Sequence, residues 1–328
     1  EPQRTNLVTY SEDFSNAAWT KSKSSVVVNS LVSPSGLVDA TKLVESSDNG
    51  YHLITTSVTS GSYMSSIYAK QAERGYVMIW NSGANSGRIF DLKNGTLGSV
   101  LGAAPLNSII EAVGDGWYRC SVENNTASSI GIYIASSSTT SFYQGDGTSG
   151  VYIWGSQVEA GSYPTSYIPT SGSTVTRNQD IFTRDGIGSL INSEEGVLFV
   201  EMAALADDGT GRYITISDGG THNIIRFYYS TNSNQIITRY YVSNTTQSNF
   251  SHTLSDSTDF NKIAFKWKVN DFALWVNGVE VATDFSGAVN VADTFNEIDF
   301  SLGGGNNFQG KVKQLQVYDT ALTDAQLT

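Results

Sequence analysis

The feature that most constrains the fold is a repeated pattern of short segments rich in β-branched and aromatic residues. Clusters of Gly, Asn, Asp and Ser separate these segments, and helical periodicity is nearly absent. In residues 263–269, Ile263, Phe265, Trp267 and Val269 fall on one face of an extended chain. The intervening residues include two lysines, which is the pattern of a half-buried antiparallel strand. The chain is therefore predicted to be all-β.

Turn signals join several of these strands into hairpins. Asn-Gly supplies the positive φ angles of a tight hairpin turn, and Asn/Ser clusters mark looser turns. Two hairpins are predicted: 272–276 with 279–282 around Asn277-Gly278, and 224–229 with 235–242 around residues 231–234. Many short strands with frequent turns indicate sandwiches rather than alternating β-α-β units. One helical turn is expected at 324–327, with Thr323 as its cap.

The length and the proline distribution indicate two domains. A chain of 328 residues can form two separate cores. Pro164 and Pro169 fall close together, and a Ser/Gly-rich stretch without apolar pattern follows them, as is typical of a linker. We place the first domain at 5–170, the linker at 171–179 and the second domain at 180–328. The predicted fold class is all-β, with two antiparallel β-sandwich (jelly-roll) domains in tandem.

The charge balance excludes several classes of partner. The formal net charge is −12, which repels phosphate backbones and anionic membranes, so no nucleic-acid partner is expected. It also disfavours acidic polysaccharides, unless basic residues cluster locally or a cation bridges the contact. No apolar run approaches the roughly 20 residues of a membrane span, so no membrane insertion is predicted.

The usual reactive side chains form no recognisable catalytic motif. The single cysteine, Cys120, shares a strand face with Tyr118 and Val122, and a buried thiol behaves as a small hydrophobic group. The three histidines are scattered without metal-ligand spacing. No phosphate loop or dinucleotide fingerprint is present.

The first domain carries several separated motifs, at residues 6–14 with Trp19, 68–70, 114–120, 145–155, 157–161 and 163–170. Together, these motifs resemble a module that recurs in phage tail and other virion proteins. This resemblance implies a jelly-roll sandwich similar to bacterial carbohydrate-binding modules.

Three segments of the second domain form a recognisable set, at residues 272–278, 308–312 and 317–327. They resemble the corresponding segments of laminin-G and concanavalin-like sandwiches. This resemblance implies the fold more firmly than the ligand, because the fold occurs in lectins, glycanases and adhesion domains.

Glycanases of the laminarinase type carry paired carboxylates on one strand of this fold, and residues 297–301 are similar to that strand. Glu297, Asp299 and Ser301 would share a face, but Ser301 stands where the second catalytic glutamate belongs. A retaining mechanism needs carboxyl groups about 5–5.5 Å apart, whereas alternate residues of a strand are about 6.6–6.8 Å apart. The chain is therefore predicted not to be an enzyme.

Jelly-roll and laminin-G domains often hold a structural or ligand-bridging Ca²⁺. The resemblance implies Ca²⁺ as a cofactor, with ligands in two oxygen-rich loops. The candidate ligands are Asp207 and Asp208 in Asp-Asp-Gly, and Asp146 in Gly-Asp-Gly.

Sugars stack their apolar faces on exposed aromatic rings, while polar groups bind the hydroxyls. In the first domain, Trp80 precedes a polar loop that ends at Arg88, and Tyr51 follows Asp-Asn-Gly. These three residues are predicted to bind carbohydrate.

In the second domain, Tyr228 shares a strand face with Arg226, and Tyr240 shares one with Thr238. This arrangement predicts an aromatic-basic patch to which Tyr228, Tyr240 and Arg226 contribute.

The resulting hypothesis is a non-catalytic virion appendage protein (tail fibre, spike or capsid fibre) that binds host-surface polysaccharide. Its expected location is the virion surface, or otherwise extracellular, with other virion proteins as partners. Because phage fibres are commonly trimers, the resemblance also implies a homotrimer. Two alternatives stay open: paired carbohydrate-binding modules of a bacterial polysaccharide-degrading enzyme, and a purely structural virion coat or decoration protein.

Overall fold

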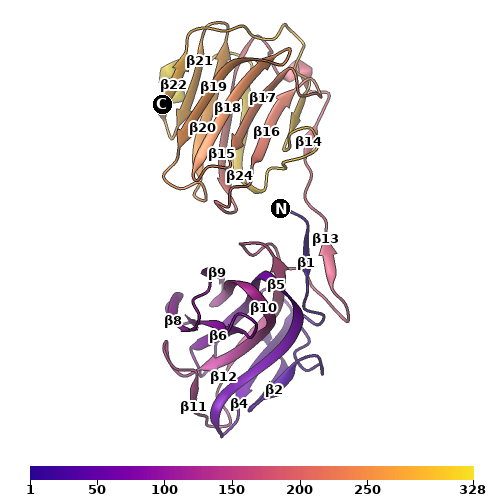
Figure 1. Cartoon of the computed structure of the whole chain (residues 1–328), viewed down its shortest axis with the longest axis vertical. Helices are drawn as coiled ribbons and strands as arrows, with labels where there is room; N and C mark the ends of the chain where they lie inside the picture. Colours follow the sequence, from indigo (N-terminus) through magenta and orange to yellow (C-terminus); the bar gives the residue numbers. More distant parts are fainter. The chain divides into compact units, whose positions relative to one another are not determined.

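The computed structural model describes all residues from Glu1 to Thr328, and almost all regular structure in it is β-strand (Figure 1). The chain divides into two compact units. We call Gln3–Asn178 the first unit, and Glu1–Pro2 with Gln179–Thr328 the second unit. All of the paired strands are antiparallel. The predicted all-β fold class is confirmed.

The first unit is built on one large curved sheet. Its strand order is β3-β4-β12-β5-β10-β6-β7-β8, and β2, β9 and β11 pair at its margins. The strands are β2 (Thr20–Ser22), β3 (Ser24–Val32), β4 (Val38–Glu45), β5 (Asn49–Gln71), β6 (Tyr76–Asn81), β7 (Ser86–Asp91), β8 (Thr96–Gly102), β9 (Asn107–Gly114), β10 (Trp117–Ala135), β11 (Phe142–Gln144) and β12 (Gly150–Ala160).

The long strands β5 and β10 fold this sheet around a single core. Their pairing is interrupted by register shifts on either side of Ala127, and such irregularities bend strands. The first part of β10 pairs with β9, and its last part pairs with β6. Buried residues from both parts, Cys120 and Ile132, belong to the same core cluster. The two long strands therefore contribute to both layers of a jelly-roll-like sandwich.

The proline-containing stretch 163–170 packs tightly on the first unit. Thr165 and Ile168 are almost fully buried. The Thr165 amide donates to the buried carboxylate of Glu159 at 2.9 Å, and Arg119 donates to the Thr165 carbonyl at 2.6 Å. After this stretch, the segment predicted as a linker contains β13 (Val175–Arg177), which pairs with β1 (Arg4–Asn6).

The second unit is a sandwich of two sheets. A six-stranded sheet has the order β14-β23-β16-β17-β18-β19, and a five-stranded sheet has the order β22-β21-β20-β15-β24. The elements are β14 (Thr183–Arg184), the 3₁₀ turn η1 (Gly188–Leu190), β15 (Glu195–Ala204), β16 (Arg212–Ser217), β17 (Ile224–Tyr229), β18 (Gln235–Val242), β19 (Thr245–Thr253), β20 (Asn261–Lys268), β21 (Phe272–Val276), β22 (Val279–Asp284), β23 (Glu297–Asp299), β24 (Gly310–Tyr318) and α1 (Asp324–Leu327).

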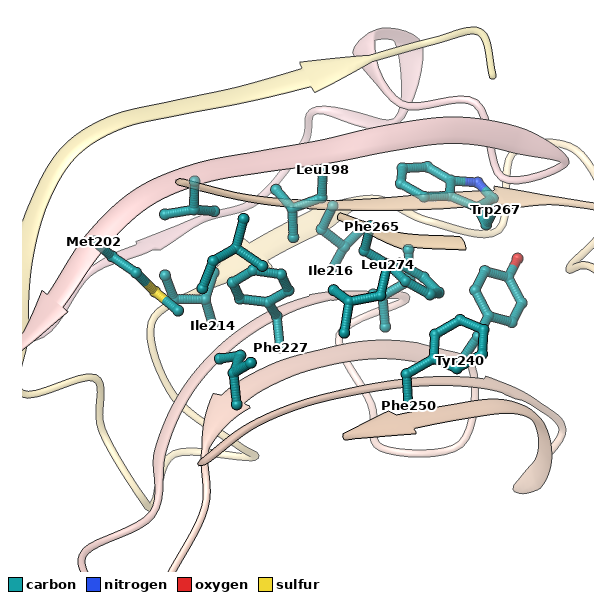
Figure 2. Packing of buried hydrophobic residues seen from close by; sticks show 14 of the residues in the cluster. Leu198, Met202, Ile214, Ile216, Phe227, Tyr240, Phe250, Phe265, Trp267 and Leu274 are labelled. Atoms are coloured by element: carbon teal, nitrogen blue, oxygen red, sulfur yellow. The ribbon is translucent and has the colours of Figure 1, made fainter. Parts of the chain in front are cut away.

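The core of the second unit lies between these two sheets (Figure 2). Leu198, Phe265 and Trp267 enter it from the five-stranded sheet, and Phe227 enters it from the six-stranded sheet. Ile263, Phe265 and Trp267 are buried on one face of β20 as the sequence predicts. The other face is not solvent-exposed throughout, because Ala264 and Lys266 are also buried, and Val269 lies beyond the strand and is exposed. The Trp267 indole also donates to the Asn192 carbonyl at 3.2 Å, which satisfies its only polar group.

Local turn chemistry agrees with the sequence. Asn277 and Gly278 have φ angles of 52° and 79°, and they join β21 to β22 as predicted. The Thr323 amide donates to the Gln326 side chain at 3.0 Å at the start of α1. No helix in the chain is both long and apolar enough to cross a membrane.

Candidate functional site

Two of the predicted sugar-binding residues line one cavity in the first unit. The cavity has a volume of about 260 Å³, and its walls are Tyr51, Met78, Trp80, Leu101, Gly102, Tyr133 and Ser141. In β6, Val77 and Ile79 point into the core, so Met78 and Trp80 point to the opposite face of the sheet. Tyr133 lies directly opposite Met78 on the neighbouring strand β10. We call this site the aromatic cavity.

The aromatic rings at the cavity are fixed by ring contacts. Tyr51 meets Tyr133 edge-on, with centroids 5.8 Å apart, and it meets Phe142 edge-on at 5.0 Å. Tyr51 and Phe142 are 47% and 52% exposed, so their rings remain available to a ligand. Burial raises the pKa of Tyr133, which keeps its hydroxyl protonated and able to donate.

Two glycines hold the Trp80 indole in place. Gly87 lies directly opposite Trp80 in the β6–β7 pair, and a Cβ atom there would come within 2.6 Å of the indole ring. A Cβ atom at Gly102 would come within 3.1 Å of the same ring. Both close approaches require glycine.

Arg88, which the sequence also predicts to bind carbohydrate, does not line the aromatic cavity. Because Gly87 is the residue opposite Trp80, Arg88 falls opposite Ile79, whose side chain is in the core. Side chains of directly opposed residues lie on the same face of a sheet. Arg88 therefore points to the other face of the sheet from Trp80.

A second group of aromatic and basic residues lies on the outer face of the six-stranded sheet. It comprises Tyr213, Arg226, Tyr228, Arg239 and Tyr241, and we call it the tyrosine–arginine patch. The Tyr213 and Tyr228 rings stack with centroids 4.2 Å apart and an interplanar angle of 10°. Burial raises the pKa of both tyrosines, so both hydroxyls stay protonated near neutral pH.

Tyr240 is a core residue, and its prediction as a sugar-binding residue is wrong. It is fully buried between the two sheets (Figure 2). Its hydroxyl donates to the Ser193 carbonyl at 2.8 Å and accepts from the Asn290 amide at 2.9 Å. Burial raises the pKa of Tyr240 to about 12. Along β18 the inward face carries Ile236, Thr238 and Tyr240, so the outward face carries Arg239 and Tyr241.

The aspartates predicted to bind calcium accept hydrogen bonds from donor groups of the protein. Asp207 accepts from Ser233 and from the Asn234 amide. Burial raises the pKa of Asp208, but hydrogen bonding and charge from Arg212 outweigh that effect and lower it overall.

Asp146 belongs to the first unit, and hydrogen bonds from Ser149 and Thr148 hold its pKa well below the usual range. No group of three or more His, Cys, Asp or Glu residues in the chain is arranged to hold a metal. These aspartates therefore do not fit a Ca²⁺ site built from their side chains.

The carboxylates of β23 form no catalytic pair. Asp299 is buried and accepts from Thr183 at 3.0 Å and from Ser301 at 2.6 Å. Burial, with the nearby charges of Asp299, Asp185 and Asp218, raises the pKa of Glu297. The side chain of Ser301, where a second catalytic glutamate would be needed, donates to Asp299 instead.

Several residues of the two sites were not predicted from the sequence. Tyr133 alternates with the core residues Ile132 and Ile134, so period-two alternation could have placed it on the cavity face. Phe142 could not be placed this way, because it reaches the site only through the pairing of β11 with Tyr51 of β5. Arg239 faces Arg226 through the hairpin register, which the turn at 231–234 alone does not determine.

Comparisons with known proteins agree with the lectin-like fold. Residues 198–328 match the family model described as the Concanavalin A-like lectin/glucanases superfamily, which covers less than half of the chain. This match supports the predicted resemblance of the second domain. No curated protein sequence matches the chain.

Similar solved structures share only low identity with the chain. The sialidase carbohydrate-binding module CBM40 of Ruminococcus gnavus, bound to α2,3-sialyllactose, is 14% identical with a TM-score of 0.37; the match covers 45% of this chain and 95% of that one. Domains LG4-5 of the mouse laminin α1 chain are 12% identical with a TM-score of 0.30, over 84% of this chain and 90% of that one. Sheep galectin-11 is 9% identical with a TM-score of 0.29; the match covers 43% of this chain and 99% of that one.

Proposed function

We propose that this chain is a non-catalytic, polysaccharide-binding protein of a virion appendage, such as a tail fibre, spike or capsid fibre. We further propose that the aromatic cavity holds part of a host-surface glycan. The observation that supports this most directly is that Tyr51, Trp80 and Tyr133 line a single cavity of about 260 Å³.

The chemistry of the aromatic cavity suits a sugar ring. The Trp80 indole and the exposed Tyr51 ring can stack on the apolar face of a pyranose. The hydroxyls of Tyr51 and Tyr133 form no hydrogen bond within the protein, and Ser141 adds a third hydroxyl to the wall. The volume lies just below the range of about 300–1,000 Å³ that is typical of small-molecule pockets. The cavity therefore fits one sugar ring better than a long stretch of chain.

A single cavity of this size gives weak binding, and a virion appendage would compensate by presenting several copies. Linking weak sites raises the overall affinity about 10²–10⁴-fold when the sites can engage together. A homotrimer, as expected for a fibre, would supply that multivalency.

The absence of catalysis is part of the proposal. The carboxylate of Asp299 accepts hydrogen bonds from Thr183 and Ser301. Glu297 has no acid/base partner at the spacing that glycoside hydrolysis needs. The aromatic cavity itself contains no carboxylate.

The test is binding of the full chain to a panel of bacterial polysaccharides, with release of reducing ends measured in the same samples. Saturable binding without release is expected. Trp80→Ala and Tyr51→Ala should each weaken binding, whereas Leu106→Ala, at a side chain that is 58% exposed outside the cavity, should not. Release of reducing ends, or equal binding by all variants, would contradict the proposal. The Tyr51 variant matters because this exposed residue can be removed without disturbing the core.

One observation favours the alternative of a purely structural coat protein. Strand β3 is the last strand at one edge of its sheet, and exposed apolar side chains line this edge. They are Val27, Val28, Val32, Leu37 and Val38, which are 45–66% exposed. An apolar edge strand readily pairs with another chain. Assembly through β3, together with no binding to any polysaccharide of the panel, would favour the coat protein over the polysaccharide-binding protein.

A further inference from the structure

Two arginines are placed side by side at the centre of the tyrosine–arginine patch. Arg226 of β17 and Arg239 of β18 are directly opposed in the antiparallel register. Like charges in that position destabilise a sheet. Neither guanidinium forms an ion pair: Arg226 donates to the Thr221 carbonyl at 3.2 Å, and Arg239 donates to the Asn249 side chain at 2.9 Å. The fold therefore places two arginines without an ion pair on the same face of neighbouring strands.

Each guanidinium group lies over a tyrosine ring. Arg226 lies over the Tyr241 ring, 4.5 Å from its centroid, and Arg239 lies over the Tyr228 ring at 5.8 Å. Tyr228 and Tyr241 are only 6% and 9% exposed, and Tyr213 stacks on Tyr228. A guanidinium that stacks through its face keeps its N–H groups in the plane of the group, free to bind an acceptor at the edge. The Nε atom of Arg226 is buried and has no hydrogen-bond partner.

No nearby carboxylate neutralises the pair. In the same row of the sheet, Asp299 is separated from Arg226 by Thr215 of the intervening strand. Its carboxylate accepts from Thr183 and Ser301 instead. In a chain with a net charge of −12, two arginines without a counter-charge form a local positive patch. Such local clustering is the condition under which the sequence permits an acidic polysaccharide as a ligand.

We propose that the tyrosine–arginine patch is a second glycan site and that it binds the anionic group of an acidic saccharide. A carboxylate or sulfate group on the sugar accepts from Arg226 and Arg239, because guanidinium N–H groups match the oxygens of such anions. The sugar ring lies along the tyrosines. The inference rests on the proposed function in that the ligand is a glycan, but it uses a different unit of the chain and different residues.

The test compares charged and neutral forms of one sugar. The probes are oligogalacturonate, its methyl ester, which lacks the charge, and dextran sulfate, each titrated calorimetrically into the full chain at low and high salt. Binding of oligogalacturonate or dextran sulfate is expected, with weaker binding at high salt and no binding of the methyl ester at this patch. Which of the two anionic probes binds distinguishes a carboxylate site from a sulfate site.

Variants of the arginines separate a ligand site from a structural role. The double variant Arg226→Gln with Arg239→Gln should lower the affinity for the anionic probe roughly tenfold or more. Its melting temperature should be unchanged or higher, because a like-charge contact is removed. Arg184→Gln, which removes an exposed arginine of β14, should leave binding unchanged.

Two results would overturn the inference: no binding of either anionic probe, or wild-type affinity in the double variant. Loss of binding accompanied by a lower melting temperature would also contradict it, since it would indicate a structural role. The two proposals fail separately. Trp80→Ala should leave binding of the anionic probe to this patch intact, and the arginine variants should leave binding at the aromatic cavity intact.

Discussion

The ring of Tyr51 meets the ring of Tyr133 edge-on, with centroids 5.8 Å apart and planes at 78°. This contact orients Tyr133 in the wall of the aromatic cavity, while its hydroxyl has no partner within the protein. Tyr133→Phe should therefore keep the ring contact and lose only a hydrogen bond to the sugar. We expect about fivefold weaker glycan binding, equivalent to roughly 1 kcal/mol, with no change in melting temperature.

Titration calorimetry with a polysaccharide that the wild type binds would measure this effect. The matched control is Tyr152→Phe, at a tyrosine of the same unit that packs in a separate cluster. Equal affinity in wild type and Tyr133→Phe would mean that the Tyr133 hydroxyl contacts no ligand.

The fold class could be predicted from the sequence because short segments of β-branched and aromatic residues, separated by turn residues, recur along the chain. The hairpin at Asn277-Gly278 could be predicted because its turn residues act locally. The face of the sheet to which a side chain points is harder to predict at the end of a strand. Trp80 and Arg88 border one loop in the sequence, but the register sets Gly87 opposite Trp80 and turns Arg88 to the other face of the sheet. Such a register is decided by cross-strand packing, which the local sequence does not contain.

Tyr240 shows the same difficulty in the second unit. A tyrosine beside an arginine has the composition of a binding surface, yet its ring lies in the core. Alternation with Ile236 would have assigned it correctly. The period of the strand indicates the face of this residue better than its residue type does.

The buried hydroxyl of Tyr240 leads to a stability prediction. Tyr240→Phe would leave the Ser193 carbonyl and the Asn290 amide without their partner. Unpaired buried polar groups cost about 1–3 kcal/mol, so the free energy of unfolding of the second unit should fall by about that much. Urea titration would measure it. Tyr318→Phe, at a tyrosine that is 37% exposed, should have little effect. Weaker glycan binding in Tyr240→Phe, with stability unchanged, would reverse our assignment of this residue.

A buried carboxylate gives the first unit a dependence on pH. Glu45 is 1% exposed, and it accepts from Arg74, from the Tyr143 hydroxyl at 2.6 Å and from the Asp146 amide at 2.9 Å. Burial alone would raise the pKa of Glu45, but these hydrogen bonds outweigh it and lower the pKa below its ordinary value. The stabilisation is therefore complete above the unfolded-state pKa of about 4.3 and is lost as the pH falls through the lower folded-state pKa.

We expect Glu45→Gln to lower the free energy of unfolding by about 3 kcal/mol at neutral pH, because it removes the buried counter-charge of Arg74 and leaves only the longer contact with Asp146 at 3.4 Å. The difference between wild type and variant should shrink as the pH falls below about 4. Denaturant titrations at several pH values would measure this. Glu111→Gln on β9, an exposed carboxylate, is the control and should show no such difference. A gap between wild type and Glu45→Gln that stays constant down to the acid limit would contradict the assignment.

Calcium should not stabilise either unit through the aspartates named above. The carboxylates of Asp146, Asp207 and Asp208 already accept from protein donors. The melting temperature should therefore be the same after chelation with EDTA as in millimolar Ca²⁺. A ligand that binds the native state raises its stability by mass action, so a clear rise with Ca²⁺ would refute this. Asp207→Asn would then show whether that loop is the site.

The thiol of Cys120 should report the opening of the first unit alone. It is fully buried, and burial raises the pKa of this thiol well above its usual range. Since the thiolate is the reactive form, the native protein should react with Ellman's reagent only through transient unfolding of this core.

Ile132→Ala removes a neighbour of Cys120 from the same core cluster, and such truncations lower the free energy of unfolding by about 2–5 kcal/mol. When opening and closing are fast compared with the reaction, the rate follows the equilibrium population of the open state. We therefore expect labelling about a hundredfold faster in Ile132→Ala. Ile214→Ala makes a similar cavity in the separate core of the second unit, and it should leave the Cys120 rate unchanged. Equal acceleration by both variants would show that the two units open as one, whereas rapid labelling of the wild type would show that Cys120 is accessible in the native fold.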